Sequence, residues 1–220
     1  MKIKKLKRRK FRHLTDEDLE NPLLPLVELC CSETSLNYVA EDTHRFIRAT
    51  AGSNTGFTGS DYAEMYFFYE RFCKHIELLY VLMHRFPDWQ LAKDGPLYRT
   101  TVMGLSKEVY DGDMFGGTTM QFDKLTQTEF WNLHQFMKSF FAFRTLAAWQ
   151  YTLNDMMRCI FGDEPFSQYD EESFRLFEYL DKLGEAMFLA YLIRGKDHML
   201  GHCANRFGIK KKKLVDADSV

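Results

Sequence analysis

Three long stretches of helical hydrophobic periodicity constrain the fold of this chain more than any other feature of its sequence. They cover residues 61–86, 127–161 and 168–194. In each stretch apolar side chains recur every three to four residues, which places them on one face of an α-helix. Each begins at a capping signal, in which Ser, Thr or Asp is followed three residues later by Glu or Asp: Asp61-x-x-Glu64, Thr126-x-x-Glu129 and Ser167-x-x-Asp170.

Shorter helical segments and one irregular region complete the pattern. Residues 35–50 have helical periodicity, and Thr15-x-x-Asp18 is a further capping box. Residues 87–125 carry several turn signals and little periodicity, so we expect an irregular insertion there, either a small hairpin or an ordered loop. The chain is therefore predicted to be all-α, a single-domain antiparallel helical bundle of six to seven helices.

Charge is distributed unevenly along this chain of net charge −2. Of its 29 Lys and Arg residues, eight lie in residues 2–13 and five in 206–213, whereas 29 of its 31 Asp and Glu residues lie in 14–205. We divide the chain into a basic amphipathic arm at 1–14, a helical body at 15–195, and a short helix with a basic segment at 196–220.

Basic ends on an acidic body are typical of proteins that bind nucleic acid or anionic lipid. The alternatives are that the ends are solvated, or that they fold back onto the body. We predict that the basic residues bind nucleic acid, DNA or RNA, through Lys4, Lys5, Lys7, Arg8, Arg9, Lys10, Arg12, Arg206, Lys210, Lys211, Lys212 and Lys213.

The N-terminal basic segment also has the periodicity of an amphipathic helix. Ile3, Leu6, Phe11 and Leu14 fall within about 140° of arc on a helical wheel, and the basic residues take the rest. A basic amphipathic helix at 2–14 suits a nucleic acid, a membrane surface or a groove on a protein partner.

The C-terminal basic segment is similar to a helix-turn-helix. Ala204, Phe207, Gly208, Ile209 and Leu214 occupy the small, apolar and glycine positions of that motif. The similarity implies that residues 210–213 contact phosphates at the start of a short recognition helix.

An alternative site lies in the stretch at 127–161. On one continuous helix, His134, Arg144 and Asp155 would interrupt an apolar face. Buried polar groups need partners, so the three predict either structural hydrogen bonds or a polar pocket in the bundle.

Metal and nuclease patterns are incomplete in this sequence. Glu41-x-x-His44 has a spacing used in di-iron bundles, but no second copy occurs. His198 and His202 lie one helical turn apart beside Cys203, without the glutamate of a zinc protease helix. Arg8 and His13 have a spacing found in helical ribonucleases, within a tract where basic pairs arise by composition. We therefore predict no cofactor and no metal.

The remaining features favour a cytoplasmic protein. The five cysteines are odd in number and form no Cys-x-x-Cys pair, which indicates reduced thiols. The N-terminus lacks the apolar core of a signal peptide, and no apolar run is long enough to span a membrane. The leading hypothesis is a non-enzymatic interaction or adaptor subunit of an intracellular nucleoprotein complex that also contacts protein. The alternative is a helical-bundle enzyme or small-ligand-binding protein with its pocket at His134, Arg144 and Asp155.

Overall fold

The computed structural model describes residues 6–32, 36–52, 57–91, 107–111, 118–162, 166 and 171–195. These ranges contain eight α-helices, one two-stranded sheet and two short turns of other helix types. In chain order the elements are the 3₁₀ turn η1 (Arg8–Lys10), α1 (Asp16–Glu20), α2 (Leu23–Ser32), α3 (Leu36–Ala51), α4 (Gly59–Arg85), β1 (Glu108–Asp111), β2 (Thr118–Gln121), α5 (Gln127–Trp131), α6 (Leu133–Phe143), α7 (Leu146–Gly162), α8 (Glu171–Ala190) and the π-helical turn η4 (Tyr191–Gly195).

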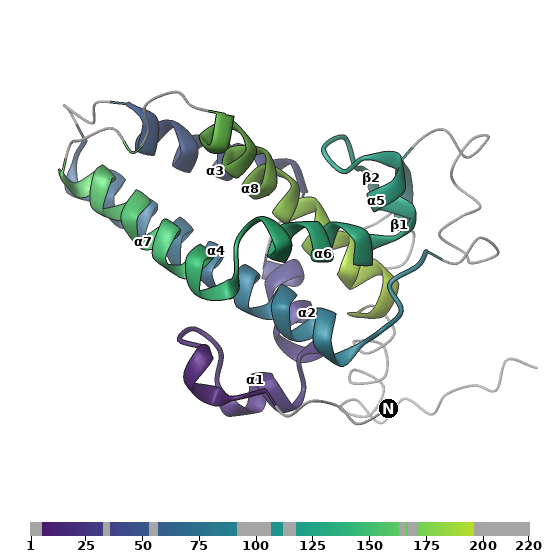
Figure 1. Cartoon of the computed structure of the whole chain (residues 1–220). Helices are drawn as coiled ribbons and strands as arrows, with labels where there is room; N and C mark the ends of the chain where they lie inside the picture. The colour runs from purple at the N-terminus through teal and green to yellow at the C-terminus, as the bar shows by residue number, and fades with distance from the viewer. Residues whose placement is uncertain are drawn as a thin grey trace, which may run out of the picture.

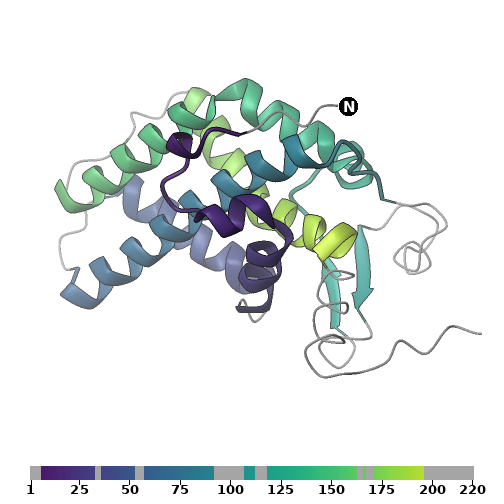
Figure 2. The same ribbon diagram turned by 90° about the horizontal axis from the view of Figure 1, so that it is seen from below.

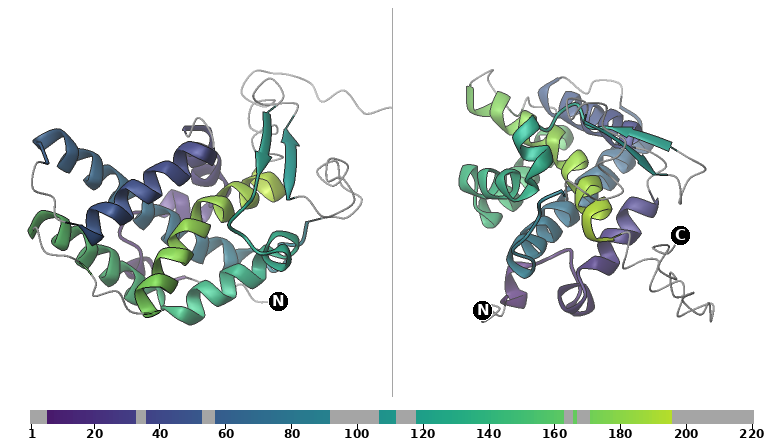
Figure 3. Two further views of the ribbon diagram at one scale, coloured as in Figure 1. Left: turned by 90° about the horizontal axis from the view of Figure 1, so that it is seen from above. Right: turned by 90° about the vertical axis from the view of Figure 1, so that its right-hand side faces the viewer.

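The all-α class is confirmed, and the long helices form two antiparallel pairs (Figure 1). The first pair is α4 and α7. Tyr62 near the start of α4 stacks on Phe161 near the end of α7, with ring centroids 5.3 Å apart. The second pair is α3 and α8, which lie side by side when the molecule is seen from above (Figure 3). Rings of Phe46 and Phe72, 5.1 Å apart, join the two pairs.

Close packing of the second pair depends on Gly184 in α8. A methyl group at Gly184 would lie 2.7 Å from Cγ1 of Val39 in α3, well inside normal contact distance. The absence of a side chain therefore lets the two helix backbones approach each other. The core between the helices is rich in aromatic rings, including the fully buried Trp89, Trp149 and Phe140.

Capping boxes set the helix starts, although one lies three residues earlier than expected. Thr126 and Glu129 form the predicted box at α5. At α4 the box is formed by Thr58 and Asp61, so the helix begins at Gly59. The prediction that Asp61 is the cap was wrong, because Asp61 instead supplies the carboxylate that accepts the backbone N–H of Thr58 (2.7 Å).

The predicted single helix at 127–161 is also wrong, because the chain breaks twice. At the first break, Asn132 forms a β-bridge with Gln90, which places the buried Trp89 against the bundle. At the second, Arg144 is extended (φ −141°, ψ 135°). There Trp149 Nε1–H donates to the carbonyl of Phe140 (3.1 Å) and satisfies the end of α6.

The irregular region expected at 87–125 includes a small hairpin. β1 and β2 pair antiparallel, with Glu108 opposite Gln121. After β2, the buried carboxylate of Glu185 in α8 accepts the backbone N–H groups of Lys124 and Leu125, each at 2.9 Å. Burial raises the pKa of Glu185, and these backbone hydrogen bonds oppose the increase. The carboxylate thereby fixes the end of the hairpin against the bundle.

Candidate functional site

The described part of the basic arm lies across α4 and α7 instead of forming the predicted amphipathic helix (Figure 2). Its only regular element is the 3₁₀ turn η1, which is followed by an extended residue, Phe11, and a bend at Arg12 and His13. Phe11 and Leu14 are 3 % and 1 % exposed, respectively, and Leu6 packs against the core. These apolar side chains therefore face the body, so they are not available as a face for a membrane or a partner groove.

A buried carboxylate in the middle of α4 holds the arm in place. Glu77 is fully buried, and its two oxygens accept the backbone N–H groups of Arg12 (2.8 Å), His13 (2.9 Å) and Leu14 (3.2 Å). Gln150 in α7 donates from Nε2 to the same carboxylate (2.7 Å). Four donors surround the two oxygens, which is the condition under which an ionised carboxylate can be buried.

Gln150 connects the arm to the second helix of the pair. Its Nε2 also donates to the carbonyl oxygen of Lys10, at 3.1 Å. The arm is thus bonded to α4 through Glu77 and to α7 through Gln150. This fixes the backbone from Lys10 to Leu14 while leaving the side chains of Lys10 and Arg12 exposed.

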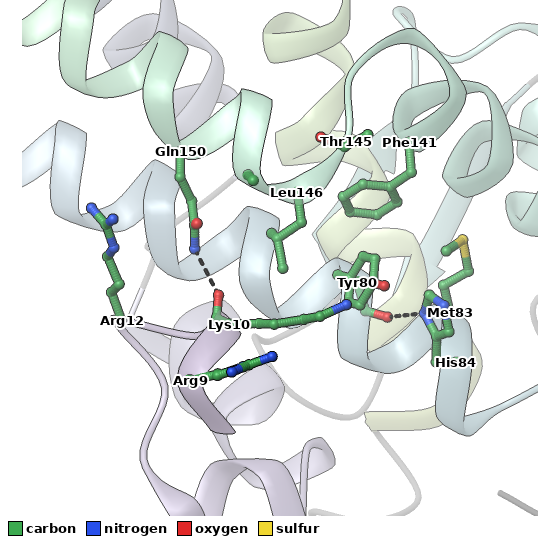
Figure 4. Close-up of a pocket in the computed structure, with 11 residues that line it drawn as sticks. Arg9, Lys10, Arg12, Tyr80, Met83, His84, Phe141, Thr145, Leu146 and Gln150 are labelled. Atoms are coloured by element: carbon green, nitrogen blue, oxygen red, sulfur yellow. Dashed lines mark hydrogen bonds between the residues drawn. The ribbon is translucent and has the colours of Figure 1, made fainter. Parts of the chain in front are cut away.

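Beside the anchored arm, the structure forms an open groove of about 750 Å³ (Figure 4). Its walls come from three parts of the chain that are distant in sequence. They are Arg9, Lys10 and Arg12 of the arm, Tyr80, Met83 and His84 near the end of α4, and Phe141, Thr145, Leu146, Ala147 and Gln150 around the break between α6 and α7.

The charged lining of this groove has a single sign. Arg9, Lys10 and Arg12 line it, and none of its lining residues is a carboxylate. Glu77 lies beneath the arm, where its oxygens are already occupied by four donors. The first turn of α7 adds partial positive charge, because the N–H groups at a helix start are not all used within the helix. The groove is therefore suited to an anion.

One wall of the groove consists of rings that orient each other. His84 Nδ1–H donates to the carbonyl of Tyr80 (2.8 Å), which leaves its Nε2 without the proton in the neutral ring. The rings of Tyr80 and His84 are 4.2 Å apart, and Phe141 meets Tyr80 edge-on at 5.1 Å. Figure 4 shows the side chains of Arg9 and Lys10 extending side by side toward this wall.

The other predicted nucleic-acid-binding residues are placed differently. Arg8 forms an ion pair with Asp16 (2.9 Å), and Lys7 is exposed outside the groove lining. The rest lie outside the described residues, as does the helix-turn-helix similarity: Lys4, Lys5, Arg206, Lys210, Lys211, Lys212 and Lys213.

The three residues of the alternative pocket have separate surroundings. Arg144 forms an ion pair with Glu172 and donates to Thr152 Oγ1 (2.9 Å). Asp155 is 41 % exposed and lies 4.0 Å from Arg158. None of these three residues belongs to the lining of the groove described above.

His134, the third member of that set, is half-buried. Burial lowers its pKa, with smaller contributions from the nearby Lys138 and His84. No hydrogen bond or ion pair joins it to Arg144 or Asp155 within the described ranges. The structure does not bring the three side chains together, because the break at Arg144 ends the continuous face on which the pocket was predicted.

The candidate metal and nuclease pairs are also separated. His44 lies 3.1 Å from Asp181 in α8, while its predicted co-ligand Glu41 is exposed. His13 contacts Glu70 (3.1 Å), away from the Arg8 ion pair. Within the ranges that the structure describes, no three His, Cys, Asp or Glu side chains are grouped to hold a metal ion. His198, His202 and Cys203 lie outside those ranges.

The residues of the helical body that line or support the groove were not predicted from the sequence. Glu77 was indistinguishable from a solvent-facing glutamate on a long amphipathic helix. Thr145 was a detectable signal, since it follows the break and its Oγ1 accepts the N–H of Ala148 (3.2 Å), as an N-cap residue does.

Comparisons of the chain with protein-family models, curated proteins and solved structures gave no match. No helix in the described ranges is both long enough and apolar enough to cross a lipid bilayer.

Proposed function

We propose that this protein is a non-enzymatic interaction subunit of an intracellular nucleoprotein complex, and that it binds nucleic acid through the basic arm and the adjacent groove. One observation carries the proposal. Arg9, Lys10 and Arg12 line a groove without a carboxylate, on a backbone that Glu77 and Gln150 fix to the body.

The anchored backbone supports binding by these three cations. A solvated basic tail loses conformational entropy when it binds, whereas this arm is already ordered by its contacts with the body. The exposed acidic side chains of the body leave other faces for protein contacts, and an odd number of cysteines favours a reducing compartment. The separate surroundings of His134, Arg144 and Asp155 favour a binding role over the alternative enzymatic one.

Binding through phosphate contacts has a characteristic salt dependence. If all three cations contact phosphates, the logarithm of the affinity falls with the logarithm of salt concentration with a slope of about −2 for a single strand and about −3 for a duplex. Between 50 and 200 mM salt the affinity then falls by about 20- to 40-fold.

The test is a titration of the full chain with fluorescently labelled 12-nucleotide strands and a 12-base-pair duplex at both salt concentrations. The variant Arg9→Gln, Lys10→Gln, Arg12→Gln should bind at least tenfold more weakly and lose most of the salt dependence. The matched control, Arg48→Gln, Arg158→Gln, Arg175→Gln, changes the net charge equally at exposed sites outside the groove. Equal losses in both variants, or no binding by the wild-type protein at 50 mM salt, would contradict the proposal.

A further inference from the structure

We infer that the groove accepts an unstacked nucleotide of a single-stranded nucleic acid, with the base against the aromatic wall and the phosphate at the arm. This inference rests on the proposed function and specifies its ligand. It follows from how apolar and cationic groups are divided within one groove.

The groove combines two surfaces that a nucleotide needs. Tyr80, Phe141 and Leu146 give it an apolar and aromatic side, and Arg9 and Lys10 give it a cationic side. In Figure 4 the side chain of Lys10 runs beneath Leu146 toward Tyr80, and the side chain of Arg9 extends in the same direction. A nucleotide has the same division, a flat apolar base joined to an anionic phosphate. Aromatic side chains beside cations are the usual means of binding single strands without sequence preference.

The separation of the groove into an aromatic side and a cationic side also disfavours a duplex. In a double helix each base is covered on both faces by its neighbours, so only phosphates, sugars and base edges are accessible. A duplex would therefore contact the cations but leave the rings of the groove without a partner. The concave shape agrees, since a pocket of about 750 Å³ is in the size range that encloses a small ligand.

A strand is favoured over a free nucleotide because the cations extend beyond the aromatic wall. Arg12 lies on the far side of Lys10 from Tyr80 and points away from the rings (Figure 4). It is exposed, and Glu77 holds its backbone through the N–H at 2.8 Å. A second phosphate along the same strand would reach this cation, whereas a mononucleotide bound at the rings would not.

The experiment measures dissociation constants of the full chain for four probes at 50 mM salt: U12, dT12, a 12-base-pair DNA duplex and uridine monophosphate. We expect at least one single strand to bind tenfold or more tightly than the duplex and the mononucleotide. Phe141→Leu should weaken single-strand binding at least fivefold, the lower range for loss of one stacked base, and leave duplex binding unchanged. The control Phe174→Leu removes a 62 % exposed ring on α8, away from the groove.

A second variant protects the test against a folding defect in Phe141→Leu. Ala147 is exposed, lines the groove, and lies in the first turn of α7. There a new carboxylate is compatible with the helix dipole, so Ala147→Glu should fold. It should weaken single-strand binding at least tenfold, whereas Ala142→Glu, exposed outside the groove lining, should not.

The outcomes separate this inference from the proposed function. The inference is overturned if the duplex binds as tightly as the single strands and if Phe141→Leu and Ala147→Glu behave like their controls. If the Arg9, Lys10 and Arg12 variant still loses duplex binding in that case, the proposed function stands. Uridine monophosphate binding as tightly as U12 overturns the assignment to a strand. No binding of any probe overturns both proposals.

Discussion

Replacement of Glu77 by Gln should detach the basic arm from the body. Each carboxylate oxygen of Glu77 accepts two donors: Oε1 accepts Arg12 N–H and Gln150 Nε2, and Oε2 accepts His13 and Leu14 N–H. A glutamine side chain has one oxygen, so one of these pairs faces an NH₂ group. Two hydrogen bonds to a charged acceptor are then lost, at about 1.5–3 kcal/mol each.

The net loss should be smaller than that sum. Removing the negative charge also removes the cost of burying it, which offsets part of the lost hydrogen bonding. We expect the free energy of unfolding to fall by about 2–4 kcal/mol in Glu77→Gln, the range typical of a disrupted buried polar network. Urea denaturation followed by circular dichroism measures it. The control is Glu64→Gln in the same helix, which removes a surface ion pair with Arg45 and should cost under about 1 kcal/mol.

Trypsin reports on the arm itself, because residues 7–12 contain five Lys and Arg. In the wild-type protein, contacts with the body should slow cleavage there. Glu77→Gln should be cleaved at least tenfold faster in this range before the body is cut, since cleavage follows local opening. If Glu77→Gln matched Glu64→Gln in both stability and cleavage rate, Glu77 would not be the anchor of the arm.

Three further predictions concern the body. Gly184→Ala should destabilise the protein by about 1–2 kcal/mol, since overpacking against Val39 outweighs the helix propensity of alanine; adding Val39→Ala should return part of that loss in urea denaturation. Burial lowers the pKa of His75 in the folded protein to about 3. As the pH falls below 6.5, the unfolded chain therefore takes up a proton at this histidine before the folded protein does. The free energy of unfolding should then fall by up to about 1.4 kcal/mol per pH unit. His75→Gln should flatten that part of the stability profile, and an unchanged slope would contradict the assignment. Trp149→Phe should cost about 1–3 kcal/mol in thermal unfolding, because the Phe140 carbonyl loses the indole donor and keeps only the longer hydrogen bond from Arg144 N–H (3.3 Å), whereas a neutral effect would show that α6 needs no indole cap.

Local sequence signals were sufficient for the helices whose determinants are also local. The box at Thr126 and Glu129 is visible as a short motif because both partners are three residues apart. The same logic explains the earlier start of α4, because Thr58 lies three residues before Asp61 and forms the box with it. Fold class followed from periodicity, which each segment carries by itself.

Features that depend on distant contacts were not predictable in this way. The break at Asn132 results from a bridge to Gln90. No glycine or proline next to Asn132 marks this break in the sequence. The arm had helical periodicity, but its backbone amides are bonded to Glu77, more than 60 positions away. Such long-range polar contacts override a local helical preference, because three hydrogen bonds to a buried carboxylate outweigh the small differences in propensity.

The candidate site was partly predictable for the same reason. The charge distribution identified Arg9, Lys10 and Arg12, since a run of basic residues is visible in sequence. Their aromatic partners Tyr80 and Phe141 belong to other helices, and only the packing of α4 against the end of α6 brings them to the arm. Sequence alone could therefore predict a basic segment but not a groove.

Nucleic acid bound at the groove beside the arm should be detectable by ultraviolet cross-linking. The full chain is irradiated with a 12-nucleotide strand containing 5-iodouridine, digested with trypsin and analysed by mass spectrometry. We expect cross-links to concentrate in the peptides covering residues 75–85 and 139–144, which contain Tyr80, His84 and Phe141. Cross-links confined to other peptides, with these two unmodified, would contradict it.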